Sequence, residues 1–81
     1  VEAWPNGLKF YPVPATEKLQ IDSRLDLSNL ELVDVLGRRT LLAEFLQKGI
    51  SIIDIANFDP GVYVLTFHVN EKQFYTPIVI E

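Results

Sequence analysis

The chain has 81 residues, enough for one small domain, and 48% of them are hydrophobic, which is too apolar for a disordered segment. It contains no cysteine, so no disulfide supports the fold, and its formal net charge of −4 argues against a nucleic-acid-binding surface. No stretch approaches the roughly 18 consecutive apolar residues of a membrane-spanning helix.

The first eight residues differ in character from the rest. Residues 1–8 contain the turn-forming cluster Trp4–Gly7 and are predicted to be the end of a linker, with the domain itself at residues 9–81. A short strand is expected at Lys9–Tyr11. Proline at positions 12 and 14 removes two backbone N–H donors, so this segment should be extended and should pair along one edge only.

Two alternating segments follow. Lys18–Asp22 alternates between polar and apolar residues, which predicts a strand with Leu19 and Ile21 on one face. Leu30–Val35 is expected to be a second strand, with its leucines inward. Gly37 then supplies the positive φ that a tight hairpin turn needs.

Residues 40–48 are ambiguous between helix and strand. The apolar residues of this stretch lie at helical spacing, and Gly49 could cap a helix; they are Leu41, Leu42, Phe45 and Leu46. The preceding strand, however, needs a partner that returns from the turn at Gly37. We therefore predict a strand here.

Three further strands complete the pattern. Ile50–Ile55 is β-branched and short, Val62–Val69 should be the longest strand, and Gln73–Ile80 should return from a tight turn at residues 70–71. About seven short strands at 8–12-residue spacing predict an all-β fold, an immunoglobulin-like β-sandwich of antiparallel strands.

The side chains of a catalytic or metal site are mostly missing from the sequence. The one histidine, His68, is expected to be a solvent-facing strand residue, and no cysteine nucleophile exists. Neither His/Cys metal binding nor the dense carboxylate spacing of a calcium loop is present. Asp59 is expected only to form a turn, and Arg38 only to be part of a solvated hairpin end. The sequence predicts a protein that is not an enzyme and that needs no cofactor.

Four short motifs follow one another along the chain. They are Y-P-x-P-A at Tyr11–Ala15, L-x-I at Leu19–Ile21, D-x-x-G-R at Asp34–Arg38, and G-V-Y-V-L at Gly61–Leu65. In this order and spacing they closely resemble the type A C-terminal sorting domain of proteins exported by the type IX secretion system. The resemblance covers roughly Phe10 to Ile80.

The resemblance implies a function without catalysis. Such a domain is a folded export signal, recognised by an outer-membrane translocon and usually removed by a sortase-like peptidase at the cell surface. The protein would then be secreted or held on the outer face of the outer membrane, having passed through the periplasm. The cut would fall in or before Val1–Leu8.

The resemblance also suggests which residues take part in recognition. They are Pro12, Pro14, Gly61, Tyr63, Lys72, Ile78 and Ile80. Tyr63 has a second interpretation, as a corner tyrosine whose hydroxyl is tied to the backbone. Pro12 and Pro14 could equally serve to end the first strand and discourage edge aggregation.

The C-terminal strand departs from the family pattern. Lys72 matches a lysine expected in the last turn, but Pro77 stands where a basic residue is expected, and the last residue is the acidic Glu81. An alternative is therefore a retained C-terminal domain of a cell-surface component of the same system.

Two further alternatives belong to other classes of protein. One is a carbohydrate- or protein-binding accessory module of a secreted hydrolase, with Trp4, Tyr11 and Tyr75 as candidate aromatic contacts. The other is a spacer of the fibronectin type III kind. The apolar terminal strand also predicts an edge-paired or strand-exchanged dimer at high concentration.

Overall fold

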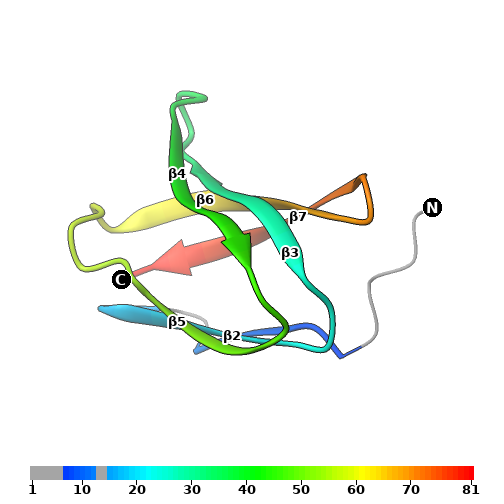
Figure 1. Ribbon diagram of the computed structural model, residues 1–81. Coiled ribbons are helices and arrows are strands. Elements are labelled where there is room, and N and C mark those ends of the chain that lie inside the picture. Colours follow the sequence, from blue (N-terminus) through cyan, green and yellow to red (C-terminus); the bar gives the residue numbers. More distant parts are fainter. Residues whose placement is uncertain (1–6, 13–14) are drawn as a thin grey trace.

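The computed structural model describes residues 7–12 and 15–81, and these form seven strands in two sheets (Figure 1). The smaller sheet has the order β1-β2-β5, with strands Lys9–Tyr11, Lys18–Ser23 and Gly49–Asp54. All its strand pairs are antiparallel.

The larger sheet has the order β4-β3-β6-β7 and is also antiparallel. Its strands are β3 (Leu27–Val33), β4 (Arg39–Leu46), β6 (Gly61–Val69) and β7 (Lys72–Ile80). The predicted all-β class is confirmed, and the two-sheet arrangement is consistent with an immunoglobulin-like sandwich. No helix is present in the part of the chain that the structure describes.

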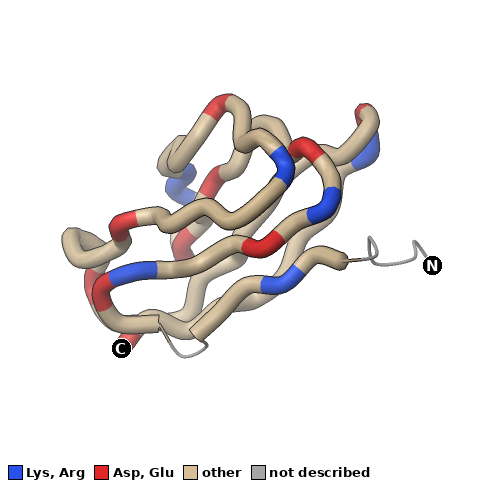
Figure 2. Tube along the Cα trace, turned by 60° about the horizontal axis from the view of Figure 1, so that its bottom comes forward, with Lys and Arg blue, Asp and Glu red and all other residues tan. Residues whose placement is uncertain are grey.

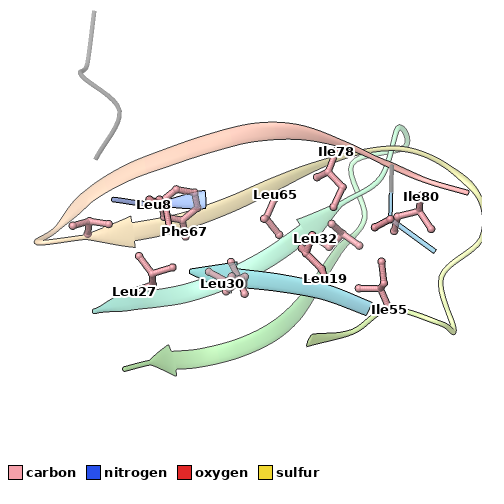
Figure 3. Packing of buried hydrophobic residues seen from close by; sticks show 13 residues of the cluster. Leu8, Leu19, Leu27, Leu30, Leu32, Ile55, Leu65, Phe67, Ile78 and Ile80 are labelled. Atoms are coloured by element: carbon pink, nitrogen blue, oxygen red, sulfur yellow. The ribbon is translucent and has the colours of Figure 1, made fainter. Parts of the chain in front are cut away.

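The core is a layer of inward-facing side chains between the two sheets. On β6, Leu65 and Phe67 are fully buried, and Tyr63 is half-buried on the same face, as alternation predicts. Leu19 and Ile21 of β2 belong to the same buried cluster, and Figure 3 shows Leu65 and Leu19 in this layer. The two sheets therefore share one continuous core.

The ambiguous stretch at residues 40–48 contains a strand, β4, with a bulge. Leu30 pairs with Ala43 and Glu31 with Leu41, so Leu42 is an extra residue in the ladder. Leu42 and Ala43 consequently both pack against the core, although they are adjacent in sequence. Leu46 also packs against the core, whereas Leu41 and Phe45 are 49% and 59% exposed, so the helical spacing includes two apolar residues that this strand leaves outside the core.

Both predicted hairpin turns are present. Gly37 has φ +82° between β3 and β4. Between β6 and β7, Asn70 and Glu71 have φ values of 49° and 70°, which is the positive pair that a two-residue type I′ turn requires.

The last strand, β7, lies at a sheet edge, where a strand that contains a proline is tolerated. Near its end the Ala15 N–H donates to the Val79 carbonyl at 2.9 Å, on the side away from β6. Because backbone groups alternate in direction along a strand, the nitrogen of Pro77 also faces away from β6. The proline therefore costs this sheet no hydrogen bond.

His68 differs from the expected solvent-facing residue. It is half-buried, and its Nδ1 is buried without a hydrogen-bond partner among the described residues. Its strand is internal to the sheet, with Ser28 opposite on β3 and Gln73 opposite on β7. Neighbouring strands on both sides reduce the exposure that this residue would have at an edge.

Truncation of the β6 core face should be costly. We expect Leu65→Ala to lower the free energy of unfolding by about 2–5 kcal/mol, because it removes buried methyl groups and leaves a cavity. Leu41→Ala, at a position that is 49% exposed, is the matched control and should cost less than about 1 kcal/mol. Equal losses in denaturant unfolding would contradict this assignment of the core.

Candidate recognition surface

The D-x-x-G-R motif forms a closed turn held by one carboxylate. Asp34 Oδ1 accepts hydrogen bonds from the backbone N–H groups of Leu36 and Arg38, each at 2.9 Å, and its Oδ2 lies 2.6 Å from the Arg38 Nε. The hydrogen bond from the Arg38 backbone, supported by those from its side chain and from Leu36, holds the pKa of Asp34 below its usual value. The shape of this turn thus depends on a charge as well as on Gly37.

The G-V-Y motif begins β6 at a tight corner. The Tyr63 hydroxyl donates to the Asp59 carbonyl at 2.7 Å, and the Tyr63 ring meets Phe58 edge-on, with centroids 6.0 Å apart. Gly61 has φ +157°, at the limit of the region that side chains disfavour. This is the corner-tyrosine arrangement expected from the sequence.

The turn and the corner lie side by side at one end of the sandwich. Together they line a hollow of about 280 Å³ whose walls include Asp34 and Arg38 from the turn and Phe58, Asp59 and Tyr63 from the corner. A second hollow of about 190 Å³ continues between the turn and residues 60–62. We call residues 34–38 and 57–63 the corner surface.

The corner surface exposes apolar side chains at its tip. Val35 is 82% exposed and Leu36 74%, and Val62 beside them is 55% exposed. Charges on the molecule are dispersed, with Lys and Arg interspersed among acidic residues along the chain (Figure 2). At the corner surface, the small apolar patch lies next to two charged residues, Arg38 and Asp59.

Of the seven predicted recognition residues, four lie near this end of the larger sheet. Gly61 and Tyr63 belong to the corner surface, and their partners on β7 are Ile80 and Ile78, respectively. Both isoleucines are only 2% exposed, so they contribute to the core. A receptor that binds the folded domain would meet their neighbour Val79, which is 37% exposed.

Lys72 and Pro12 lie apart from the corner surface. Lys72 begins β7 at the opposite end of the β6–β7 hairpin. Pro12 is exposed just after β1, beyond a cis peptide bond to Tyr11. A hollow of about 490 Å³ lies beside this segment, between β1 and residues 76–78 of β7. Pro14 lies outside the described residues.

The charged residues of the corner surface are closer together than the sequence indicates. The sequence predicted that Asp59 forms a turn and that Arg38 lies at a solvated hairpin end, in two separate places. In the structure, Asp34, Arg38 and Asp59 line one hollow. A signal for this site was present in the D-x-x-G-R motif. That the D-x-x-G-R turn lies beside the G-V-Y motif could not be predicted, because this proximity depends on how the strands pair.

Two of the aromatic contacts suggested for a carbohydrate-binding module, Tyr11 and Tyr75, are not on one face. Tyr11 lies on β1 of the smaller sheet, where its hydroxyl accepts a hydrogen bond from the Gln20 amide. Tyr75 lies on β7 of the larger sheet, on the face opposite the core. Trp4 lies outside the described residues.

Neither a metal cluster nor a membrane-spanning helix is found among residues 7–12 and 15–81. These residues contain no group of three or more His, Cys, Asp or Glu side chains that could hold a metal ion. Within the same ranges, no helix is long and apolar enough to span a membrane. The corner surface is thus defined by its two hollows and by the side chains that it exposes.

The fold and the corner surface define a small all-β domain whose sequence motifs build an exposed end. The family model for the secretion system C-terminal sorting domain matches residues 9–81, and the chain belongs to this type IX secretion family. Domains of this family mark proteins that are secreted or attached to the cell surface, and they are not enzymatic domains. No curated protein and no solved structure gives a significant match.

The corner hydrogen bond can be tested by removing one oxygen atom. Tyr63→Phe should lower the free energy of unfolding by about 1 kcal/mol, because it removes the bond to the Asp59 carbonyl and keeps the ring contact with Phe58. Tyr75→Phe, at a position 71% exposed, should change it by less than about 0.5 kcal/mol. Indistinguishable unfolding curves for the two variants would show that the corner bond contributes nothing.

The turn carboxylate should make stability depend on pH. The pKa of Asp34 is lower in the folded state, so the charged form favours folding; this contribution is present above the usual pKa and is lost as pH falls through the lowered value. Asp34→Asn should therefore lower the melting temperature at pH 7, and its difference from the wild type should shrink below that lowered pKa. A difference that is constant with pH would contradict this account.

Proposed function

We propose that this domain directs its precursor through the outer membrane by being recognised, as a folded unit, by the type IX translocon. The observation that carries the proposal is the meeting of two distant sequence motifs, at Asp34–Arg38 and Gly61–Tyr63, on one exposed end of the fold. The family assignment supports the export role. A binding function of this kind requires no catalytic activity and no cofactor of the domain itself.

The corner surface is the contact that we propose for the translocon. Asp34 and Gly37 are required to form the turn. Val35 and Leu36 at its tip are exposed apolar side chains, and their exposure contributes nothing to the stability of the fold. Exposed apolar side chains that lie together are typical of protein–protein contacts. Arg38, which engages Asp34 through Nε, presents the rest of its guanidinium to solvent and can add a directional contact.

We also propose that a surface peptidase separates the domain from its cargo on the N-terminal side of Leu8. Leu8 is only 5% exposed and belongs to the core, so a cut after it would remove a core side chain. The alternative is a domain that is retained on a surface component, for which Pro77, in place of the expected basic residue, is the support. Detection of the uncleaved precursor on cells would favour that alternative.

The terminal strand is the second candidate for recognition. Its outer face presents Tyr75, Pro77 and Val79, while the alternate residues Ile78 and Ile80 hold the strand to the core. Recognition through β7 would therefore use side chains that the inward isoleucines position. The three remaining candidates stay predictions for the same role; they are Lys72, Pro12 and Pro14.

Export of a reporter distinguishes the two surfaces. Residues 1–81 are fused behind a signal peptide and a reporter in a cell with type IX secretion. Leu36→Lys should reduce export by about tenfold, the effect of losing a contact worth about 1.4 kcal/mol, because it places a charge in the apolar tip. Tyr75→Lys, at a position of similar exposure on β7, should leave export unchanged.

Thermal unfolding of both purified variants is the control for folding. If only Tyr75→Lys blocks export of a folded domain, the terminal strand is the recognised surface and the corner proposal is wrong. If neither variant affects export, recognition uses another face of the sandwich.

A further inference from the structure

The two sheets have four edge strands, and three of them are protected against pairing. An edge strand that is regular and apolar tends to pair with another chain. β1 has only three residues and is followed by Pro12, β4 is bulged at Leu42, and β7 carries Pro77 and is bridged by Ala15. The remaining edge strand is β5.

β5 has none of these protective features. It pairs with β2 over six residues without a register shift, from Gly49 to Asp54, and it contains no proline. Ile50 is 66% exposed and Ile52 is 60% exposed. No strand in the described part of the chain pairs with its outer edge.

The direction of the β5 backbone groups follows from one hydrogen bond. The Ile55 N–H donates to the Glu17 carbonyl at 2.8 Å, toward β2. Because the groups alternate along a strand, Ile50, Ile52 and Asp54 direct their N–H and C=O groups to the outer edge. These three residues can therefore form a ladder with another strand.

We propose that β5 pairs with β5 of a second copy of this chain, antiparallel and about a two-fold axis at Ser51. The segment that would pair reads Lys48-Gly49-Ile50-Ser51-Ile52-Ile53-Asp54, and it is complementary to its own reverse. In this register Ile50 lies opposite Ile52 of the second copy. Lys48 directly precedes β5, and its backbone N–H donates to Asp26 Oδ1 at 2.8 Å, so only its side chain could approach Asp54 of the second copy. An isologous contact repeats both pairs twice.

The neighbouring register is less favourable. An axis at Ile52 would place Ile50 opposite Asp54 of the second copy, so that an aliphatic side chain meets a carboxylate and Lys48 has no acidic counterpart. Opposite charges and paired β-branched residues stabilise directly facing positions across strands. The pattern of β5 therefore selects the register centred on Ser51 and favours a second copy over an unrelated strand.

This pairing does not depend on the proposed export function. It can be measured on the purified chain, so each proposal can fail without the other. It also places the dimer contact on β5, whereas the sequence predicted it on the terminal strand. The result would be one continuous sheet with the order β1-β2-β5-β5-β2-β1 across two copies.

The absence of native cysteine allows a test of register by disulfide cross-linking. Ser51→Cys should form a disulfide-linked dimer under mild oxidation, since facing residues in a non-hydrogen-bonded pair have Cα atoms about 4.5 Å apart. Ile53→Cys is the matched control, because Ile53 is also half-buried and lies on the same face of β5. It lies two residues from the axis, so its sulfur would be about 13 Å from its counterpart and should not cross-link.

Sedimentation of the uncross-linked chain gives the second measurement. Ile52→Lys should raise the dimer dissociation constant at least about tenfold, because each dimer contains the charge twice. Leu41→Lys, on the bulged edge strand β4, should leave it unchanged. A wild-type chain that stays monomeric up to millimolar concentration, or equal cross-linking at positions 51 and 53, would overturn the proposal.

Discussion

The packing of alternate β6 side chains against the smaller sheet is the interaction on which this fold depends. β6 pairs with both β3 and β7, so its inward residues Leu65 and Phe67 fix the face of three strands at once. Phe67 also lies between two other rings, with centroids 5.5 Å from Phe10 and 5.8 Å from Phe74. In a chain of this length without disulfides, this hydrophobic contact must offset most of the conformational entropy lost on folding.

The motifs that define the family are first of all devices that begin and end strands around that core. Gly61 and Tyr63 start β6 at its corner, and Asp34 holds the turn that returns the chain as β4. Such residues are explained by the fold alone. The exposure of Val35 and Leu36 is not explained in this way, which is why we propose these two residues as the contact, and the motif residues around them as the groups that position it.

Local patterns in the sequence were sufficient to predict the existence of the strands, the inward faces of β2, β3 and β6, and the hairpin turns. They did not give every boundary, because β3 is Leu27–Val33 where Leu30–Val35 was expected. They were insufficient where neighbours in space decide. The bulge at Leu42 turns two adjacent residues toward the core, which no strand alternation predicts. His68 is half-buried because strands flank it on both sides. The meeting of the two motifs at the corner surface depends on strand pairing, which no single segment reveals. Ile78 and Ile80 were predicted as recognition residues, and the structure places both side chains in the core, at 2% exposure.

The protection of the β7 edge limits how the terminal strand can be recognised. Ala15 occupies the outer backbone groups at Val79 and Glu81, and Pro77 has no N–H to offer, so only the part of the edge before Pro77 could accept another strand. A receptor that recognises this strand in the folded domain must therefore contact side chains on its outer face more than its backbone. The corner surface has no such restriction, because its tip is a turn whose side chains are already exposed. The same argument separates the two kinds of contact that we propose for this small domain: backbone pairing at β5, and side-chain recognition at the end where its motifs meet.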